Sequence, residues 1–73
     1  MLRVISQNGE FDFPYDKICI RITDRTVYAR TMNDSRDILI AVYSSPKKVK
    51  HAMDTLLTYH SNKMPFFQFP EEK

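Results

Sequence analysis

The stretch from Ile38 to Ser61 reads ILIAVYSSPKKVKHAMDTLLTYHS, and its hydrophobic spacing changes at Pro46. Before Pro46, apolar residues alternate as they do in a half-buried strand; after it they recur as on one face of a helix. The strand-like alternation extends back to Met1. Strands therefore come first and one helix follows, which is typical of a small α+β protein.

Pro46 marks where the helix begins. Proline suits the first helical position because its missing N–H has no partner there, and Ser44 or Ser45 can cap the exposed amides. The helix should end near Ser61, with Asn62 as the C-cap. Its predicted core stripe follows helical spacing and comprises Val49, Ala52, Met53, Leu56, Leu57 and His60.

The first hairpin is indicated by Asn8-Gly9. The two residues lie between strand-like segments at 2–6 and 11–15, and both tolerate the positive φ that a type I′ turn needs. Pro14 cannot donate a ladder hydrogen bond, so the second strand is an edge or ends there. This hairpin is the clearest local prediction in the chain.

The remaining strands are separated by turn residues. We predict strands at 17–22, 27–32 and 37–43, turns at 23–26 and at Asn33–Arg36, and a short extended segment at 64–70 that returns to the sheet edge. We therefore expect one α+β domain over residues 1–73. Its four- or five-stranded antiparallel sheet should be packed on one face by the single helix of the C-terminal half.

The small size of the chain limits its core. It has 73 residues, one cysteine and two histidines. A domain of this size usually needs a disulfide, a metal or a partner to supplement its core. Cys19 has no second cysteine to pair with, and Cys19, His51 and His60 lack the spacing of a structural zinc site. We therefore expect a homo-oligomer or a host partner, and no metal or cofactor.

The charge pattern is mixed. The net charge of +2 includes no long basic stripe, so nucleic-acid binding has no clear support. Acidic residues lie in the turns and at Glu71-Glu72, whereas basic residues cluster around Pro46. The sequence has neither an apolar run of membrane-spanning length nor an apolar N-terminal stretch like that of a signal peptide. We expect a soluble, cytoplasmic protein with no membrane partner.

Alternation predicts the two faces of the sheet. The face beneath the helix should carry Ile18, Ile20, Ile22, Ile38, Ile40 and Val42. If Val27 and Ala29 also face inward, the opposite face should carry Lys17, Cys19, Arg21, Tyr28, Arg30, Leu39, Ala41 and Tyr43.

The opposite face has fewer charges than a solvated surface usually has. Arginine beside tyrosine can bind planar or phosphorylated ligands by stacking and forked hydrogen bonds, which makes Arg21, Tyr28 and Arg30 candidate ligand-binding residues. The same residue types are enriched at subunit interfaces. A homo-oligomer contact, a ligand or nucleic-acid surface, and ordinary exposure all stay open.

Three lysines crowd the predicted first turn of the helix. Lys47, Lys48 and Lys50 lie where the helix dipole disfavours cations, so a bound anion would offset the cost. We treat them as candidate anion-binding residues. The alternative is a solvated basic face balanced by nearby acids such as Glu71 and Glu72.

Residues with catalytic chemistry are few. Cys19 is expected to be a small apolar strand residue and His60 part of the core, while His51 should face solvent. The carboxylates have no visible pairing, and no glycine-rich loop could cradle a phosphate. We expect a binding protein, with no catalytic residues, rather than an enzyme.

Several short motifs resemble those of small accessory proteins from phages and prophages of low-GC Gram-positive bacteria. The motifs are VISQNG at 4–9, FPY at 13–15, VYSS at 42–45 and FFQFPE at 66–71. The architecture is also similar to that of the Thoeris anti-defence sponge proteins, which oligomerise and sequester cyclic nucleotide signals of host immunity.

This resemblance implies a phage protein that antagonises host defence by stoichiometric binding. The bound partner would be a nucleotide second messenger or a host defence protein such as a CRISPR nuclease, and a structural, self-assembling phage protein is a further alternative. Ligand pockets would lie between subunits, with Arg30, Phe66, Phe67 and Lys63 at the matching positions. The chain departs from the sponge pattern in the short connection from Ser61 to Pro65.

Overall fold

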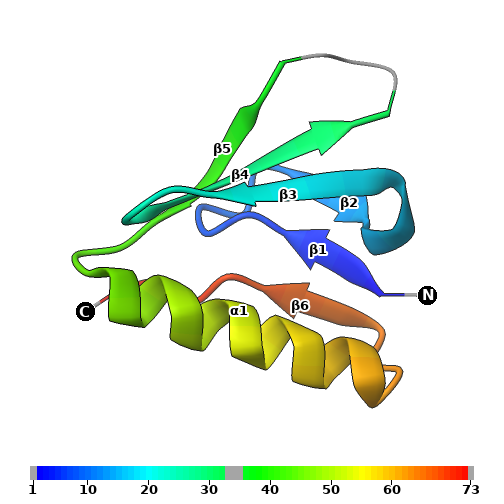
Figure 1. Cartoon of the computed structure of the whole chain (residues 1–73). Coiled ribbons are helices and arrows are strands. Elements are labelled where there is room, and N and C mark those ends of the chain that lie inside the picture. The colour runs from blue at the N-terminus through cyan, green and yellow to red at the C-terminus, as the bar shows by residue number, and fades with distance from the viewer. Residues whose placement is uncertain (1, 33–35, 73) are drawn as a thin grey trace.

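The computed structural model describes residues 2–32 and 36–72 (Figure 1). These residues form an α+β structure with one α-helix, as predicted. The elements in chain order are β1 (Arg3–Ile5), β2 (Asp12–Pro14), the 3-10 turn η1 (Tyr15–Lys17), β3 (Ile18–Ile22), β4 (Thr26–Thr31), β5 (Ile38–Val42), α1 (Pro46–Ser61) and β6 (Phe66–Gln68). The turn predicted at Asn33–Arg36 lies outside the described residues, apart from Arg36.

The strands form two three-stranded sheets instead of the predicted four- or five-stranded one. Their orders are β2-β1-β6 and β3-β4-β5. Pro14 ends β2, and η1 follows at once, so the ladder does not continue from β2 into β3. The free edge of β1 is taken by β6, which runs parallel to it, whereas the other pairings are antiparallel. The predicted return of the C-terminal segment to a sheet edge is confirmed.

The first hairpin forms without the predicted type I′ turn. Ser6 and Phe11 close the loop through a backbone hydrogen bond of 2.9 Å, and Gly9 alone in it has a positive φ, 78°. The side-chain oxygen of Asn8 accepts hydrogen bonds from Ser6 Oγ and the Glu10 amide. Because Asn8 satisfies these local donors at negative φ, the chain forms a longer loop.

A β-bulge changes the faces predicted for β5. The register with β4 shifts between Val27 and Tyr28, so Ile40 and Ala41 are both buried. Beyond the bulge Val42 is 49% exposed and Tyr43 is buried. The inward assignment of Val42 and the outward assignments of Ala41 and Tyr43 are therefore wrong. Those of Val27 and Ala29 are confirmed, since both are fully buried.

Helix α1 has the predicted bounds. Ser45 is its N-cap and accepts the Lys48 amide, and Asn62 is its C-cap. Its buried residues are Val49, Ala52 and Leu56. Leu57 and His60 are exposed, so the predicted stripe is too wide at its C-terminal end. The His60 ring instead lies against Tyr15, with centroids 4.6 Å apart.

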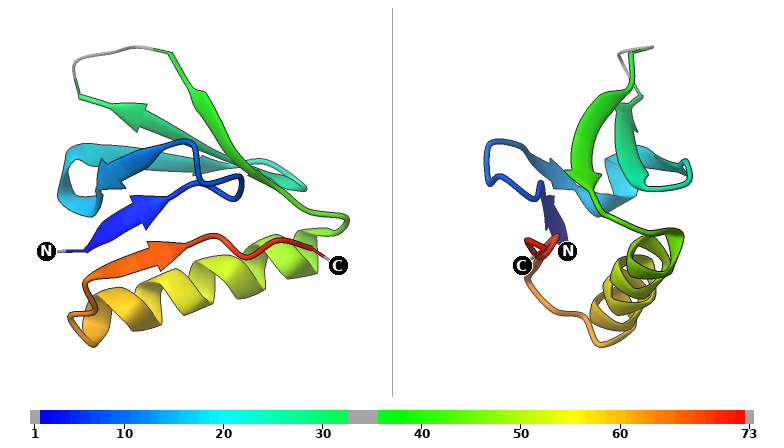
Figure 2. Two further views of the ribbon diagram at one scale, coloured as in Figure 1. Left: turned by 180° about the vertical axis from the view of Figure 1, so that it is seen from behind. Right: turned by 90° about the vertical axis from the view of Figure 1, so that its left-hand side faces the viewer.

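The core lies between the two sheets and the helix. Helix α1 runs alongside β6, and β6 runs alongside β1 (Figures 1 and 2). The fully buried side chains come from both sheets, the helix and the segment after β6, and they include Val4, Val27, Val49, Leu56 and Phe69. No helix within residues 2–32 and 36–72 has the length and apolar character needed to cross a bilayer.

Candidate functional site

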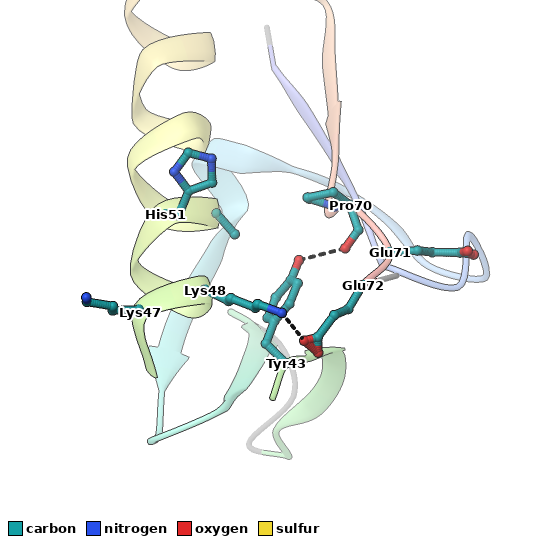
Figure 3. A pocket seen from close by; sticks show the side chains of 8 residues that line it. Tyr43, Lys47, Lys48, His51, Pro70, Glu71 and Glu72 are labelled. Atoms are coloured by element: carbon teal, nitrogen blue, oxygen red, sulfur yellow. Dashed lines mark hydrogen bonds and ion pairs between the residues drawn. The ribbon is translucent and has the colours of Figure 1, made fainter. Parts of the chain in front are cut away.

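A pocket of about 330 Å³ opens at the start of α1 (Figure 3). Its walls come from the first turns of the helix, from Tyr43 just after β5, and from the C-terminal tail, which we define as Pro70–Glu72. The lining residues are Tyr43, Lys47, Lys48, His51, Ala52, Pro70, Glu71 and Glu72. We call this the basic pocket. Two regions that are far apart in sequence, residues 43–52 and the C-terminal tail, therefore meet at one site.

The C-terminal tail is held in place by side chains. The Pro70 carbonyl accepts hydrogen bonds from the Tyr43 hydroxyl at 3.0 Å and from Gln7 Nε2 at 3.1 Å (Figure 3 draws the first). Gln7 also pairs with the Val42 amide and carbonyl, as a neighbouring strand would. One glutamine thus joins the first hairpin, β5 and the tail.

The pocket already holds a carboxylate, that of Glu72. Its Oε2 accepts hydrogen bonds from the Ser44 amide at 3.0 Å and from Lys48 Nζ at 3.0 Å. The hydrogen bond with Ser44, followed by that with Lys48, holds the pKa of Glu72 below its usual value. These two donors, beside the N-terminus of a helix, form a site that accepts an anionic oxygen.

Tyr43 contributes a neutral donor. Burial, with a further effect from the Glu72 charge, raises the pKa of Tyr43 to about 12. The hydroxyl therefore stays protonated near neutral pH and donates to the tail carbonyl. Its ring, with Ala52 and Pro70, gives the pocket an apolar wall.

The three candidate lysines do not share one site. Lys47 and Lys48 line the basic pocket, where Lys48 extends toward Glu72 and Lys47 points the other way (Figure 3). Lys50 lines a different hollow, together with Ile22 and Met53. Of the predicted anion-binding residues, Lys48 therefore makes the direct contact with a carboxylate.

Arg21, Tyr28 and Arg30 do lie together, on the face of the β3-β4-β5 sheet that points away from the core. The Arg21 guanidinium is 5.1 Å from the centre of the Tyr28 ring. Arg21 and Arg30 both pair with Asp37, at 2.6 and 3.1 Å. The hydrogen bond from Arg30, with a further one from Arg21, lowers the pKa of Asp37. We call this surface the outer face.

The predicted aromatic residues of β6 lie in the other sheet. Phe67 is buried and makes edge contacts with Tyr59 and Phe69, at 5.2 and 5.1 Å between ring centres. Phe66 is 53% exposed, and Lys63 lies in the connection after α1 with a φ of 56°. Because Arg30 belongs to β4 and the phenylalanines to β6, their strands do not pair in one protomer.

Sequence reasoning missed Gln7 and Tyr43 as parts of a site. It did name the Glu71-Glu72 tail as acids that could balance the three lysines, and the Lys48–Glu72 pair agrees with that alternative. Gln7 belongs to the VISQNG motif, which does not show that its side chain reaches β5 and the tail, and the bulge in β5 reversed the expected orientation of Tyr43. The one further sequence feature that could have pointed to this site was Gln7, a polar residue beside the Asn8-Gly9 turn. The described residues contain no group of three or more side chains that could ligate a metal.

Comparisons of the chain with protein-family models, curated proteins and solved structures gave no match.

Proposed function

We propose that this protein is a non-enzymatic binding protein that holds a small phosphate-bearing ligand of the nucleotide class in the basic pocket. One observation carries the proposal: a carboxylate, that of Glu72, is bound there by the Ser44 amide and Lys48. A phosphate oxygen can accept from the same two donors, because backbone N–H groups and ammonium groups are the usual partners of phosphates.

The rest of the pocket favours a nucleotide over a free phosphate. The buried Tyr43 and Ala52, with Pro70, form an apolar wall, and His51 offers an exposed ring. An exposed ring of this kind can stack on a nucleobase. A volume of about 330 Å³ is at the lower end of the range for small-molecule pockets.

Glu72 has to leave its position when the ligand binds. It is part of the same chain and competes at a high effective concentration, which weakens the apparent affinity of the ligand. The residues that line the pocket all belong to one protomer.

In its cellular setting, we propose that the protein sequesters a nucleotide signal of host anti-phage defence and so antagonises it by stoichiometric binding. This part of the proposal rests on the resemblance to small phage proteins and to cyclic nucleotide sponges. A binding protein of this kind releases its ligand chemically unchanged when it is denatured.

Isothermal titration calorimetry tests the pocket directly. The titrants are AMP, a cyclic dinucleotide and inorganic phosphate, and the protein is compared with Lys48→Gln and with Lys50→Gln. Lys48→Gln should weaken nucleotide binding about tenfold or more, because it removes a charge-assisted hydrogen bond. Lys50→Gln is the matched control, since Lys50 lies on the same helix but lines a different hollow.

Two results would contradict the proposal. One is the absence of nucleotide binding at millimolar concentrations. The other is equal weakening by Lys48→Gln and Lys50→Gln, which would indicate a diffuse charge effect without a pocket.

A further inference from the structure

The outer face presents two rows of cross-strand neighbours. Arg21, Tyr28 and Leu39 lie side by side on β3, β4 and β5, and Cys19 lies beside Arg30 in the next row. Val42 lies opposite Thr26 on the same face. Helix α1 packs in the core, on the same face of this sheet as Val27 and Ala29. The outer face is the opposite one, so the helix does not cover it.

The polar part of the outer face is ordered before any partner arrives. Arg21 lies over the Tyr28 ring, and Arg21 and Arg30 are both held by Asp37. A side chain that is already fixed loses less conformational entropy on binding. Tyrosine and arginine are also the residue types that dominate binding energy at protein interfaces.

An apolar strip runs beside this cluster. Leu39 and Val42 of β5 are each 49% exposed, and Leu39 is next to Tyr28 in the register. Exposed aliphatic side chains beside a tyrosine and two arginines give a surface with an apolar part and a cationic part. A partner that fits must offer apolar side chains together with negative charge.

The charge balance argues against a second copy of this chain. Among the described residues of one outer face, the guanidiniums of Arg21 and Arg30 share the carboxylate of Asp37. A symmetric contact between two outer faces would bury twice as many guanidiniums as carboxylates, and unbalanced buried charge is costly. An acidic partner would instead neutralise the excess.

The outer face fits nucleic acid less well. Sheets that bind single strands stack bases on exposed aromatic rings. Within the described residues this face has one such ring, Tyr28, and Arg21 lies over it.

We propose that the outer face is a docking surface for an acidic protein segment that carries apolar side chains. Arg21 and Arg30 would receive its carboxylates, while Leu39 and Val42 would pack against its apolar residues. Arg21, Tyr28, Arg30 and Leu39 do not line the basic pocket, although Val42 shares a neighbouring hollow with Glu71 and Glu72. The two proposals are therefore tested at different residues and can fail independently.

Fluorescence anisotropy with synthetic probes tests the docking surface. The probe is a labelled peptide that alternates glutamate with leucine, and its counterparts are the same peptide with lysine in place of glutamate and a thymidine oligonucleotide. The acidic peptide should bind saturably. The double variant Arg21→Gln/Arg30→Gln should weaken it about tenfold or more. Arg3→Gln is the matched control, because Arg3 is an exposed arginine paired with Asp12 on the other sheet.

The only cysteine of the chain gives a second, site-specific readout in the unmodified protein. Cys19 is exposed on the outer face beside Arg30. Bound acidic peptide should slow the alkylation of Cys19 by iodoacetamide in proportion to its occupancy. This readout holds even if the double variant does not fold.

Several outcomes would overturn the proposal. They are the absence of acidic-peptide binding at millimolar concentrations, equal binding of the lysine peptide, tighter binding of the oligonucleotide, and alkylation of Cys19 at an unchanged rate with the peptide bound. A concentration-dependent dimer that the double variant abolishes would assign the face to a second copy instead.

Discussion

At the scale of single residues, Glu72 controls access to the basic pocket. Its carboxylate accepts from Ser44 and Lys48 in the position that a ligand anion would take. These contacts favour the ionised form, which is why its pKa is lowered. The ionised form of Glu72 therefore helps to hold the tail over the pocket, together with the hydrogen bonds of Tyr43 and Gln7 to Pro70.

This linkage predicts a pH dependence. Because the pKa of Glu72 is lower in the folded protein than in an open chain, docking of the tail contributes fully above the ordinary pKa of glutamate. The contribution is lost as the pH falls through the lowered pKa. The Ser44 amide, which donates to Glu72, should therefore change its NMR chemical shift over this acid range.

Glu72→Gln is the control for this titration, since it removes the ionisable group and keeps the shape. The Ser44 shift should then be flat with pH, and nucleotide binding near neutral pH should be tighter, because the competing charge is gone. A Ser44 titration that is unchanged in Glu72→Gln would assign the effect to another acid, such as Glu71.

At the scale of elements, β6 shows how neighbouring residues take different roles. Phe66 and Phe67 are both candidate ligand residues by resemblance, yet Phe67 is buried against Tyr59 and Phe69 while Phe66 is 53% exposed. The alternation of a strand separates them, because successive side chains point to opposite faces.

Substitution should separate the two phenylalanines clearly. Phe67→Ala leaves a cavity in the core and should lower the free energy of unfolding by about 3–5 kcal/mol. Phe66→Ala, the matched control, should change it by about 0.5 kcal/mol, as exposed substitutions usually do. Urea unfolding followed by circular dichroism measures both, and similar losses for the two variants would contradict the assignment of Phe67 alone to the core.

The sequence predicted the helix and strands better than it predicted which strands pair with each other. Pro46 and the apolar spacing after it predicted α1 correctly, because a helix depends on residues close in sequence. The bulge in β5 was not predictable, since one extra residue reverses every later side chain without changing the composition. The split into two sheets occurs where Pro14 ends β2 and η1 follows, whereas the third strand of the first sheet depends on β6 reaching β1, a contact between residues far apart in sequence.

At the scale of the whole molecule, the candidate site is built from distant segments. The sequence left two interpretations for the lysines at the start of α1, an anion site or a basic face balanced by acids such as Glu72, and the Lys48–Glu72 pair agrees with the second. The shape of the pocket was not predictable, because Gln7, Tyr43 and Glu72 come together only when the tail folds back across the first hairpin and β5. The outer face was predicted in part. Alternation correctly placed Arg21, Tyr28 and Arg30 on one face, but it assigned Ala41, Val42 and Tyr43 to the wrong faces because of the bulge in β5.

The central claim is that a nucleotide displaces Glu72 from the basic pocket. The most direct measurement is a titration of the folded protein with AMP at neutral pH, followed by the backbone amide shifts of Ser44, Lys48 and Glu72. The account predicts saturable shifts at all three, with smaller ones in Lys48→Gln at the same AMP concentration. Shifts confined to the outer face, or none at any residue, would contradict it.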